Sequence, residues 1–163
     1  MDITLNQLKA IFKEIAEKHK QINGFHWGDF LDAISDKEIA HYPLMVCTIQ
    51  PSPMEAQAVG MNVTVSIWDK YNEGDLDQLD SVFSDTLGTV VDLKNIFLSY
   101  RFEDLFSTEF TSNNTPTKHK GQDLVAGWWF NINFGIFDSA NYCGIPIDDS
   151  FEFLERGKNY IPN

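Results

Sequence analysis

Few of the residues that commonly do chemistry stand at spacings that would let them act together. The four histidines are His19, His26, His41 and His119, and no two of them are four residues apart. The metalloprotease pattern HExxH, the phosphate-binding patterns GxxxxGKS/T and GxGxxG, and the acyl-transfer pattern GxSxG are all absent. We therefore expect no metal site, and no motif points to phosphate binding or acyl transfer.

Cys47 and His41 would form a nucleophile and its base only if the thiol were activated. The two residues are six positions apart near the start of an apolar segment, and nothing nearby in the sequence activates the thiol. We expect Cys47 and the second cysteine, Cys143, to be buried thiols, and we leave open whether they pair.

Scattered carboxylates are the remaining candidates for acid–base chemistry. Asp69, Asp85, Asp92 and Asp123 are far apart in a chain that holds 24 acidic residues, so carboxylates will approach one another by chance. We expect these side chains to cap helices and to lie on solvated faces.

Two adjacent tryptophans, Trp128 and Trp129, belong to an apolar segment that alternates with a period of two. A strand places such neighbours on opposite faces. We expect one ring in the core. The other, Trp129, should lie on the second face or in a subunit interface, in preference to stacking on a sugar or on single-stranded DNA.

The one local basic cluster consists of Lys118, His119 and Lys120, within the polar stretch Ser112–Gly121. Residues 51–100, in contrast, hold eight acidic and two basic residues. A subunit with a basic loop and an acidic flank can bind a second copy of itself. We predict that Lys118, His119, Lys120 and Trp129 are subunit-interface residues.

Three helices and two strands are predicted in the first hundred residues. Thr4 and Gln7 have the spacing of a capping box, and apolar residues at helical spacing continue from there. The predicted elements are helices at Thr4–His19, Asp29–Ile34 and Asp75–Leu98, and strands at Leu44–Gln50 and from about Gln57 to Ile67.

The rest of the chain is predicted to be a hairpin followed by about twenty irregular residues. Asp104–Thr111 and Leu124–Phe137 are its strands, and Ser112–Gly121 is a long loop between them. Hairpins with helices laid across them predict an α+β fold. In that fold an antiparallel or mixed sheet has two main helices packed on one face and carries a long hairpin loop.

Length and charge limit the function. The 163 residues suffice for one domain, and 12 basic against 24 acidic residues give a net charge of −12. A protein with this net negative charge is not expected to bind nucleic-acid phosphates. The chain shows neither a secretory signal at its start nor the roughly 18 consecutive apolar residues of a membrane helix, so we expect a protein of a reducing cytoplasm without a membrane partner.

Six short sequence motifs follow one another along the chain. They are INGFHWGD at 22–29, YP at 42–43, WD at 68–69, LDSVFSDTL at 79–87, DLVAGW at 123–128 and CGIP at 143–146. With the predicted elements between them, over about residues 3–147, they resemble neck or tail-completion proteins of tailed bacteriophages. These are tail-terminator-like ring subunits of the head–tail connector, and the chain is most similar to versions in crAss-like and other Bacteroidetes phages.

The resemblance implies a non-enzymatic virion structural protein without a cofactor, assembled in the host cytoplasm and located in the neck or tail. It implies a homo-oligomeric ring of six or twelve subunits that contacts adjacent portal, ring or tail proteins. DNA would pass through the ring without specific binding. Residues 1–147 would form one tail-terminator-like domain and residues 148–163 an extended C-terminal arm.

Two other classes of protein also fit the sequence. An acidic monomeric binding protein, such as an antitoxin, an immunity protein or a DNA mimic, agrees equally well with the charge. A small hydrolase with paired carboxylates would need a concave pocket that holds at least two carboxylates of raised pKa. A ring subunit should self-associate, whereas an immunity-type protein should capture one basic partner as a monomer.

Overall fold

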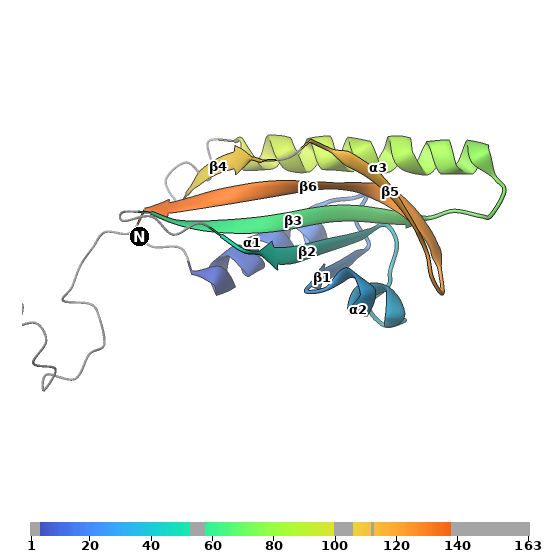
Figure 1. Cartoon of the computed structure of the whole chain (residues 1–163), viewed down its shortest axis with the longest axis horizontal. Coiled ribbons are helices and arrows are strands. Elements are labelled where there is room, and N and C mark those ends of the chain that lie inside the picture. The colour runs from blue at the N-terminus through green and yellow to red at the C-terminus, as the bar shows by residue number, and fades with distance from the viewer. Residues whose placement is uncertain (1–3, 53–57, 100–105, 112, 138–163) are drawn as a thin grey trace, which may run out of the picture.

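The computed structural model describes residues 4–52, 58–99, 106–111 and 113–137, which contain six strands and three helices. In chain order they are α1 (Leu5–Lys18), β1 (Gly24–Trp27), α2 (Phe30–Ser35), β2 (Leu44–Gln50), β3 (Ala58–Lys70), α3 (Leu76–Phe97), β4 (Ser107–Phe110), β5 (Thr115–Lys120) and β6 (Leu124–Phe137). The strands form one mixed sheet in the order β1-β2-β3-β6-β4, with β5 also paired to β6 (Figure 1). The predicted α+β class is confirmed, and its likeness to tail terminators stays a prediction.

Local signals place the helix ends within one residue of the prediction. Thr4 caps α1, and a complete capping box links it to Gln7. Asp29 caps α2, and the carboxylate of Asp75 accepts the N–H of Gln78 at 2.9 Å to cap α3. Across the described ranges, none of these helices is long and apolar enough to span a membrane.

The middle of the sheet is made by two long antiparallel strands. β3 and β6 pair continuously, from Ala58 opposite Phe137 to Lys70 opposite Val125. β2 pairs antiparallel with β3, and β1 pairs parallel with β2. The predicted strands at β2, β3 and β6 are confirmed. β1 was not predicted, because four half-buried residues are too few to show a period.

The stretch predicted as a long hairpin loop is largely a strand. β4 pairs with the end of β6 and β5 with its beginning, so the two short strands follow each other along one edge of β6. Only residues 121–123 separate β5 from β6, and the predicted Ser112–Gly121 loop is wrong. Every second residue of β5 is exposed, which allows a polar sequence, and an edge strand tolerates Pro116.

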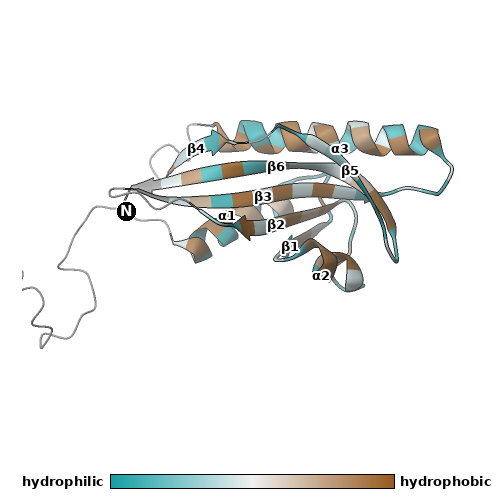
Figure 2. Ribbon diagram, in the orientation of Figure 1, coloured by the Kyte–Doolittle hydropathy of each residue, from teal (hydrophilic) through white to brown (hydrophobic). Residues whose placement is uncertain are grey.

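One face of the sheet is covered by both long helices, as predicted. The ring of Phe12 in α1 lies 4.9 Å from that of Phe97 in α3 and 5.7 Å from that of Phe134 in β6, measured between centroids. Apolar and polar bands alternate along α3 in Figure 2, as expected for a helix with one side on the sheet. Other fully buried residues of this core are Leu8, Met45, Cys47, Val63, Val65, Ile67, Leu93 and Ile132.

Within the described ranges, the other face of the sheet is covered only at one end. There α2 packs Ala33 and Ile34 against Leu44, Val46 and Val125. The remainder, which we call the open face, carries the alternate residues of the same strands. Its polar side chains include Thr48, Gln50, Asn62, Thr64, Ser66, Asn131 and Asn133.

The predicted domain limit at residue 147 and the predicted C-terminal arm at residues 148–163 lie outside the described residues, as does Cys143.

Candidate functional site

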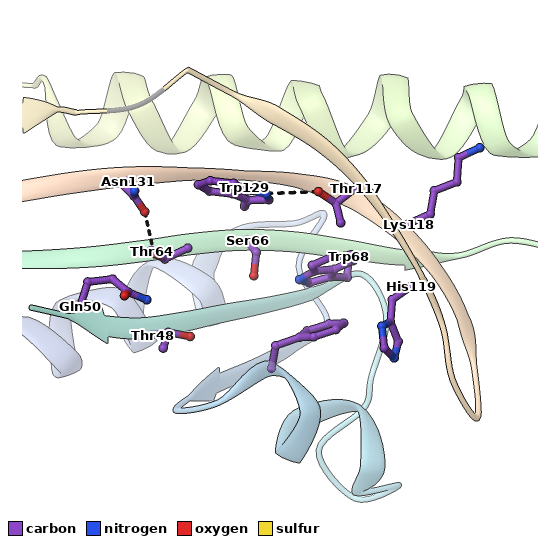
Figure 3. A pocket seen from close by; sticks show the side chains of 11 residues that line it. Thr48, Gln50, Thr64, Ser66, Trp68, Thr117, Lys118, His119, Trp129 and Asn131 are labelled. Atoms are coloured by element: carbon purple, nitrogen blue, oxygen red, sulfur yellow. Dashed lines mark hydrogen bonds between the residues drawn. The ribbon is translucent and has the colours of Figure 1, made fainter.

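A cavity of about 540 Å³ lies on the open face, between α2 and the β5–β6 hairpin (Figure 3). Strands β2, β3 and β6 form its floor. It is lined by Phe30, Thr48, Gln50, Thr64, Ser66, Trp68, Thr117, Lys118, His119, Trp129 and Asn131. The volume, and the combination of rings with a few polar groups, are those of a small-molecule site.

The pleat of the strands determines the chemistry of the floor, since β3 directs valines into the core and hydroxyls into the cavity. The register places Thr64 opposite Asn131 and Ser66 opposite Trp129. Thr64 Oγ1 donates to Asn131 Oδ1 at 2.6 Å, and Ser66 Oγ donates to the carbonyl of Val46 at 3.3 Å. These bonds orient the floor side chains before any ligand binds.

The walls of the cavity depend on a bend of the β5–β6 hairpin toward α2 (Figure 1). The ring of His119 in β5 meets the ring of Phe30 edge-on, with 5.2 Å between centroids. Phe30 in turn stacks on Trp68, with centroids 4.2 Å apart. Residues from three separate parts of the chain therefore close one end of the cavity.

A polar cluster holds the turn of the hairpin against the rest of the protein. Asp123 accepts a hydrogen bond from the Tyr42 hydroxyl at 3.3 Å and pairs with Lys70 Nζ at 3.0 Å. Burial, followed by the charge of Asp123, raises the pKa of Tyr42 to about 12. A tyrosine is protonated at neutral pH even at its ordinary pKa of 10.0, and the shift extends the range in which the Tyr42 hydroxyl donates to Asp123 to more alkaline pH.

The two adjacent tryptophans lie on opposite faces of the sheet, as predicted. Trp128 packs against the core, and its Nε1 donates to the carbonyl of Phe83 in α3 at 2.8 Å. Trp129 is half-buried in the cavity, and its Nε1 donates to Thr117 Oγ1 at 3.2 Å. Trp129 thus belongs to a concave site, and its role in a subunit interface stays a prediction.

The three basic residues predicted to act as one cluster are separated by the pleat of β5. Lys118 Nζ lies 5.9 Å from the ring centre of Phe83, and Lys120 Nζ pairs with Glu73 at 2.9 Å, both toward α3. His119 faces the cavity instead (Figure 3). Strand alternation in a stretch predicted to be a loop accounts for this difference.

Three buried side-chain atoms of the described residues have no hydrogen-bond partner. They are Asn62 Oδ1, Trp68 Nε1 and Asn133 Oδ1. All three belong to the open face, where Asn62 stands opposite Asn133 and Trp68 lines the cavity. A buried polar atom without a partner costs about 1–3 kcal/mol. Sequence reasoning did not find this group of unpartnered atoms, because the group depends on which residues of neighbouring strands stand opposite each other.

Cys47 is fully buried beneath the helices, on the face away from the cavity. Burial raises the pKa of its thiol well above the usual value, so the thiol stays protonated and is a poor nucleophile. The predicted packing role of Cys47 is confirmed.

The aspartates do not meet in the cavity, whose lining contains neither Asp nor Glu. Asp69 lies at the end of β3 on the helix-covered face. Burial and, to a smaller extent, the charge of Asp85 raise its pKa, and the N–H of Lys70 opposes this. This cavity therefore does not supply the paired carboxylates that a hydrolase would need.

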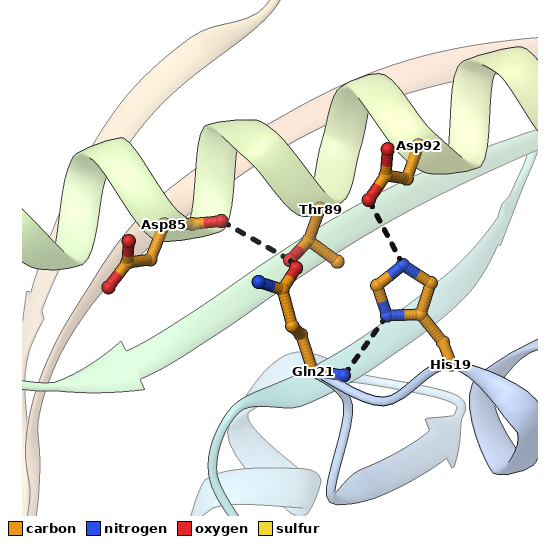
Figure 4. A network of polar contacts seen from close by, with 5 residues as sticks. All are labelled: His19, Gln21, Asp85, Thr89 and Asp92. Carbon is orange, nitrogen blue, oxygen red and sulfur yellow. Dashed lines mark hydrogen bonds and ion pairs between the residues drawn. The ribbon is translucent and has the colours of Figure 1, made fainter.

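Asp85 and Asp92 take part in a polar network between α1 and α3 (Figure 4). Asp92 Oδ2 lies 3.4 Å from His19 Nε2, and His19 Nδ1 accepts the N–H of Gln21 at 3.3 Å. Thr89 Oγ1 lies 3.2 Å from the carbonyl of Asp85 and 3.3 Å from Gln21 Oε1. The network ties the end of α1 to α3, which is a structural role. In the described part of the chain, no three His, Cys, Asp or Glu side chains are placed to hold a metal ion.

Comparison with known proteins gives no relative from which a role could be transferred. No protein-family model matches the chain, and no curated protein matches its sequence. Function therefore rests on the cavity, on the charges of the outer surface and on the order of the elements.

Proposed function

We propose that this protein is a non-enzymatic structural subunit of a bacteriophage head–tail connector, in which identical copies form a ring around passing DNA. The resemblance of about residues 3–147 to tail-terminator-like neck proteins supports this role, and an α+β layer is compatible with it. The structural observation that carries the proposal is the charge of α3.

The outer side of α3 is acidic along its length. Asp77, Asp80, Asp85 and Asp92 are all exposed, and Lys94 is the one basic residue of the helix. Their spacing keeps the aspartates on one side of a helix of 22 residues, which is about 33 Å long. An acidic surface repels DNA phosphates and therefore suits the wall of a channel along which DNA must slide.

Ring closure needs two complementary surfaces on each subunit, because contacts within a ring are heterologous. The β5 edge offers a basic surface through Lys118 and Lys120. Lys120 and Glu73 are 69% and 75% exposed, and such an exposed pair contributes little to stability, so Lys120 can exchange Glu73 for a carboxylate of the next subunit. We assign the contact first to these two lysines, and the interface role of His119 and Trp129, which face the cavity, stays a prediction.

Size-exclusion chromatography with light scattering, combined with electron microscopy, tests the ring. The wild-type protein should form a closed assembly. Lys118→Glu combined with Lys120→Glu should convert it to smaller species while the circular dichroism of the subunit is unchanged. Lys9→Glu combined with Lys13→Glu on exposed positions of α1 changes the net charge equally and should leave the ring intact.

Two outcomes would contradict the proposal in different ways. A ring that survives reversal of Lys118 and Lys120 removes the β5 edge from the interface. If the wild-type protein is a monomer at all concentrations and captures one basic partner, the ring is ruled out. The acidic binding protein is then favoured, because the negative charge of α3 also suits that role.

A further inference from the structure

The cavity on the open face is lined almost entirely by uncharged groups. Of its lining residues only Lys118 and His119 can carry a positive charge, and the Lys118 ammonium lies over Phe83 toward α3. A phosphate or carboxylate ligand would thus find no ammonium or guanidinium directed into the cavity by the described lining, and it would meet a net charge of −12. The lining favours a neutral ligand.

The hydroxyls of the lining retain hydrogen-bonding capacity. Thr117 Oγ1 accepts from Trp129 Nε1, which leaves the hydroxyl proton of Thr117 available to a ligand. Thr48 and Ser66 donate their protons to backbone carbonyls, which leaves oxygen lone pairs to accept. Donors and acceptors that lie side by side match a ligand whose own hydroxyls both donate and accept.

Trp68 adds a second, independent observation. Its side chain is only 5% exposed and lines the cavity, yet its Nε1 donor has no partner among the described residues. Buried donors are almost always satisfied by protein, water or ligand. Because this nitrogen has almost no accessible surface, an acceptor from the cavity would reach it only after a neighbouring side chain shifts.

A flat aromatic surface completes the site. Trp68 is already stacked on Phe30, so the half-buried ring of Trp129 is the indole left for a ligand. The bond from its Nε1 to Thr117 fixes the orientation of the ring. The C–H groups on one side of a pyranose ring pack favourably on the negative face of an indole.

We infer that this cavity binds a neutral saccharide, with one pyranose ring stacked on Trp129 and its hydroxyls bonded to Thr117, Thr48 and Ser66. This binding activity goes beyond the ring-forming role and does not depend on it.

Saturation-transfer NMR with neutral trisaccharides of glucose, galactose, mannose and N-acetylglucosamine provides the test. At least one of them should bind, and tryptophan fluorescence should give its Kd. AMP and glucose 6-phosphate should bind more weakly, because the site holds no fixed cation for their phosphates. Failure of all four trisaccharides to bind, or tighter binding of either phosphate compound, would overturn the assignment.

Variants locate the binding in the cavity. Trp129→Ala should weaken it at least tenfold and Thr117→Val three- to tenfold. Lys9→Ala, at an exposed position of α1 on the other face of the sheet, removes one positive charge outside the cavity and should leave the affinity unchanged. Thr117→Val keeps the test valid if Trp129→Ala does not fold. Wild-type affinity in both folded variants, or a second copy of the chain cross-linked into the cavity in place of sugar, would contradict the proposal.

Discussion

The helix-covered face of the sheet and the open face are built from alternate residues of the same strands, but they differ in what they contribute. The covered face holds closely packed rings and aliphatic chains, such as Phe12 against Phe97 and Phe134. The open face holds hydroxyls, amides and the half-buried Trp129, together with the buried polar atoms that lack partners. One face therefore supplies stability, and the other retains hydrogen-bonding capacity that the described residues do not use.

The largest expected difference comes from truncating one side chain on each face. Phe12→Ala removes a fully buried ring that contacts three other rings and should lower the free energy of unfolding by about 3–5 kcal/mol. Thr64→Ala on the open face loses the bond to Asn131 and should cost about 1 kcal/mol. Urea unfolding measures both, and equal losses would contradict the contrast.

Replacing asparagines on the open face should raise stability, whereas the truncations above lower it. Asn62→Val combined with Asn133→Val removes two buried oxygens that have no partner, from positions directly opposite each other, and should raise the free energy of unfolding by about 1–2 kcal/mol. Val63→Asn, the opposite change one residue along β3 and on the covered face, should destabilise the protein. Destabilisation by the asparagine pair in urea unfolding would show that a partner satisfies those oxygens.

Replacing a glycine with alanine adds a single methyl group, and doing so at two positions sharpens the comparison. Gly88 lies on the exposed side of α3, where an added Cβ meets nothing within 4 Å, so Gly88→Ala should stabilise by up to about 1 kcal/mol. Gly127 lies in β6, where a Cβ would run into the backbone carbonyl of Ile67, and Gly127→Ala should destabilise. Thermal unfolding should therefore shift in opposite directions, and a lower melting temperature for Gly88→Ala would count against the described packing of α3.

The smallest effect is expected at Asp69, the charged end of the covered face. Its pKa is raised by burial and by Asp85, so the folded state holds the proton more tightly and stability falls as the pH rises through that pKa. Asp69→Asn should stabilise at pH 7, by less than about 1 kcal/mol because the group is partly solvated. The gain should vanish below the ordinary Asp value of 3.8, and Asp85→Asn should reproduce part of it. Thermal unfolding measures the stabilisation. If Asp69→Asn stabilises the protein as much at low pH as at pH 7, the electrostatic cause is refuted.

Prediction from the sequence succeeded where the signal is local. The capping box at Thr4, the cap at Asp75 and the alternation that separates Trp128 from Trp129 all depend on residues within a few positions of each other. It failed at β1, which is too short to show a period, and at β5, whose polar residues and Pro116 are typical of a loop as well as of an edge strand.

The sequence by itself determined the helices, the long strands, the acidic charge and the burial of Cys47, because capping and periodicity act over one or two turns or pleats. Only the tertiary structure decided that Phe30, Trp68 and His119 meet, since pairing of distant strands and the bend of the β5–β6 hairpin bring them together. Pairing with β6 made residues 115–120 a strand, and the pleat of that strand then put Lys118 and Lys120 on one side and His119 on the other. The sequence of a strand determines which side chains share a face, but the element that covers that face comes from elsewhere in the chain.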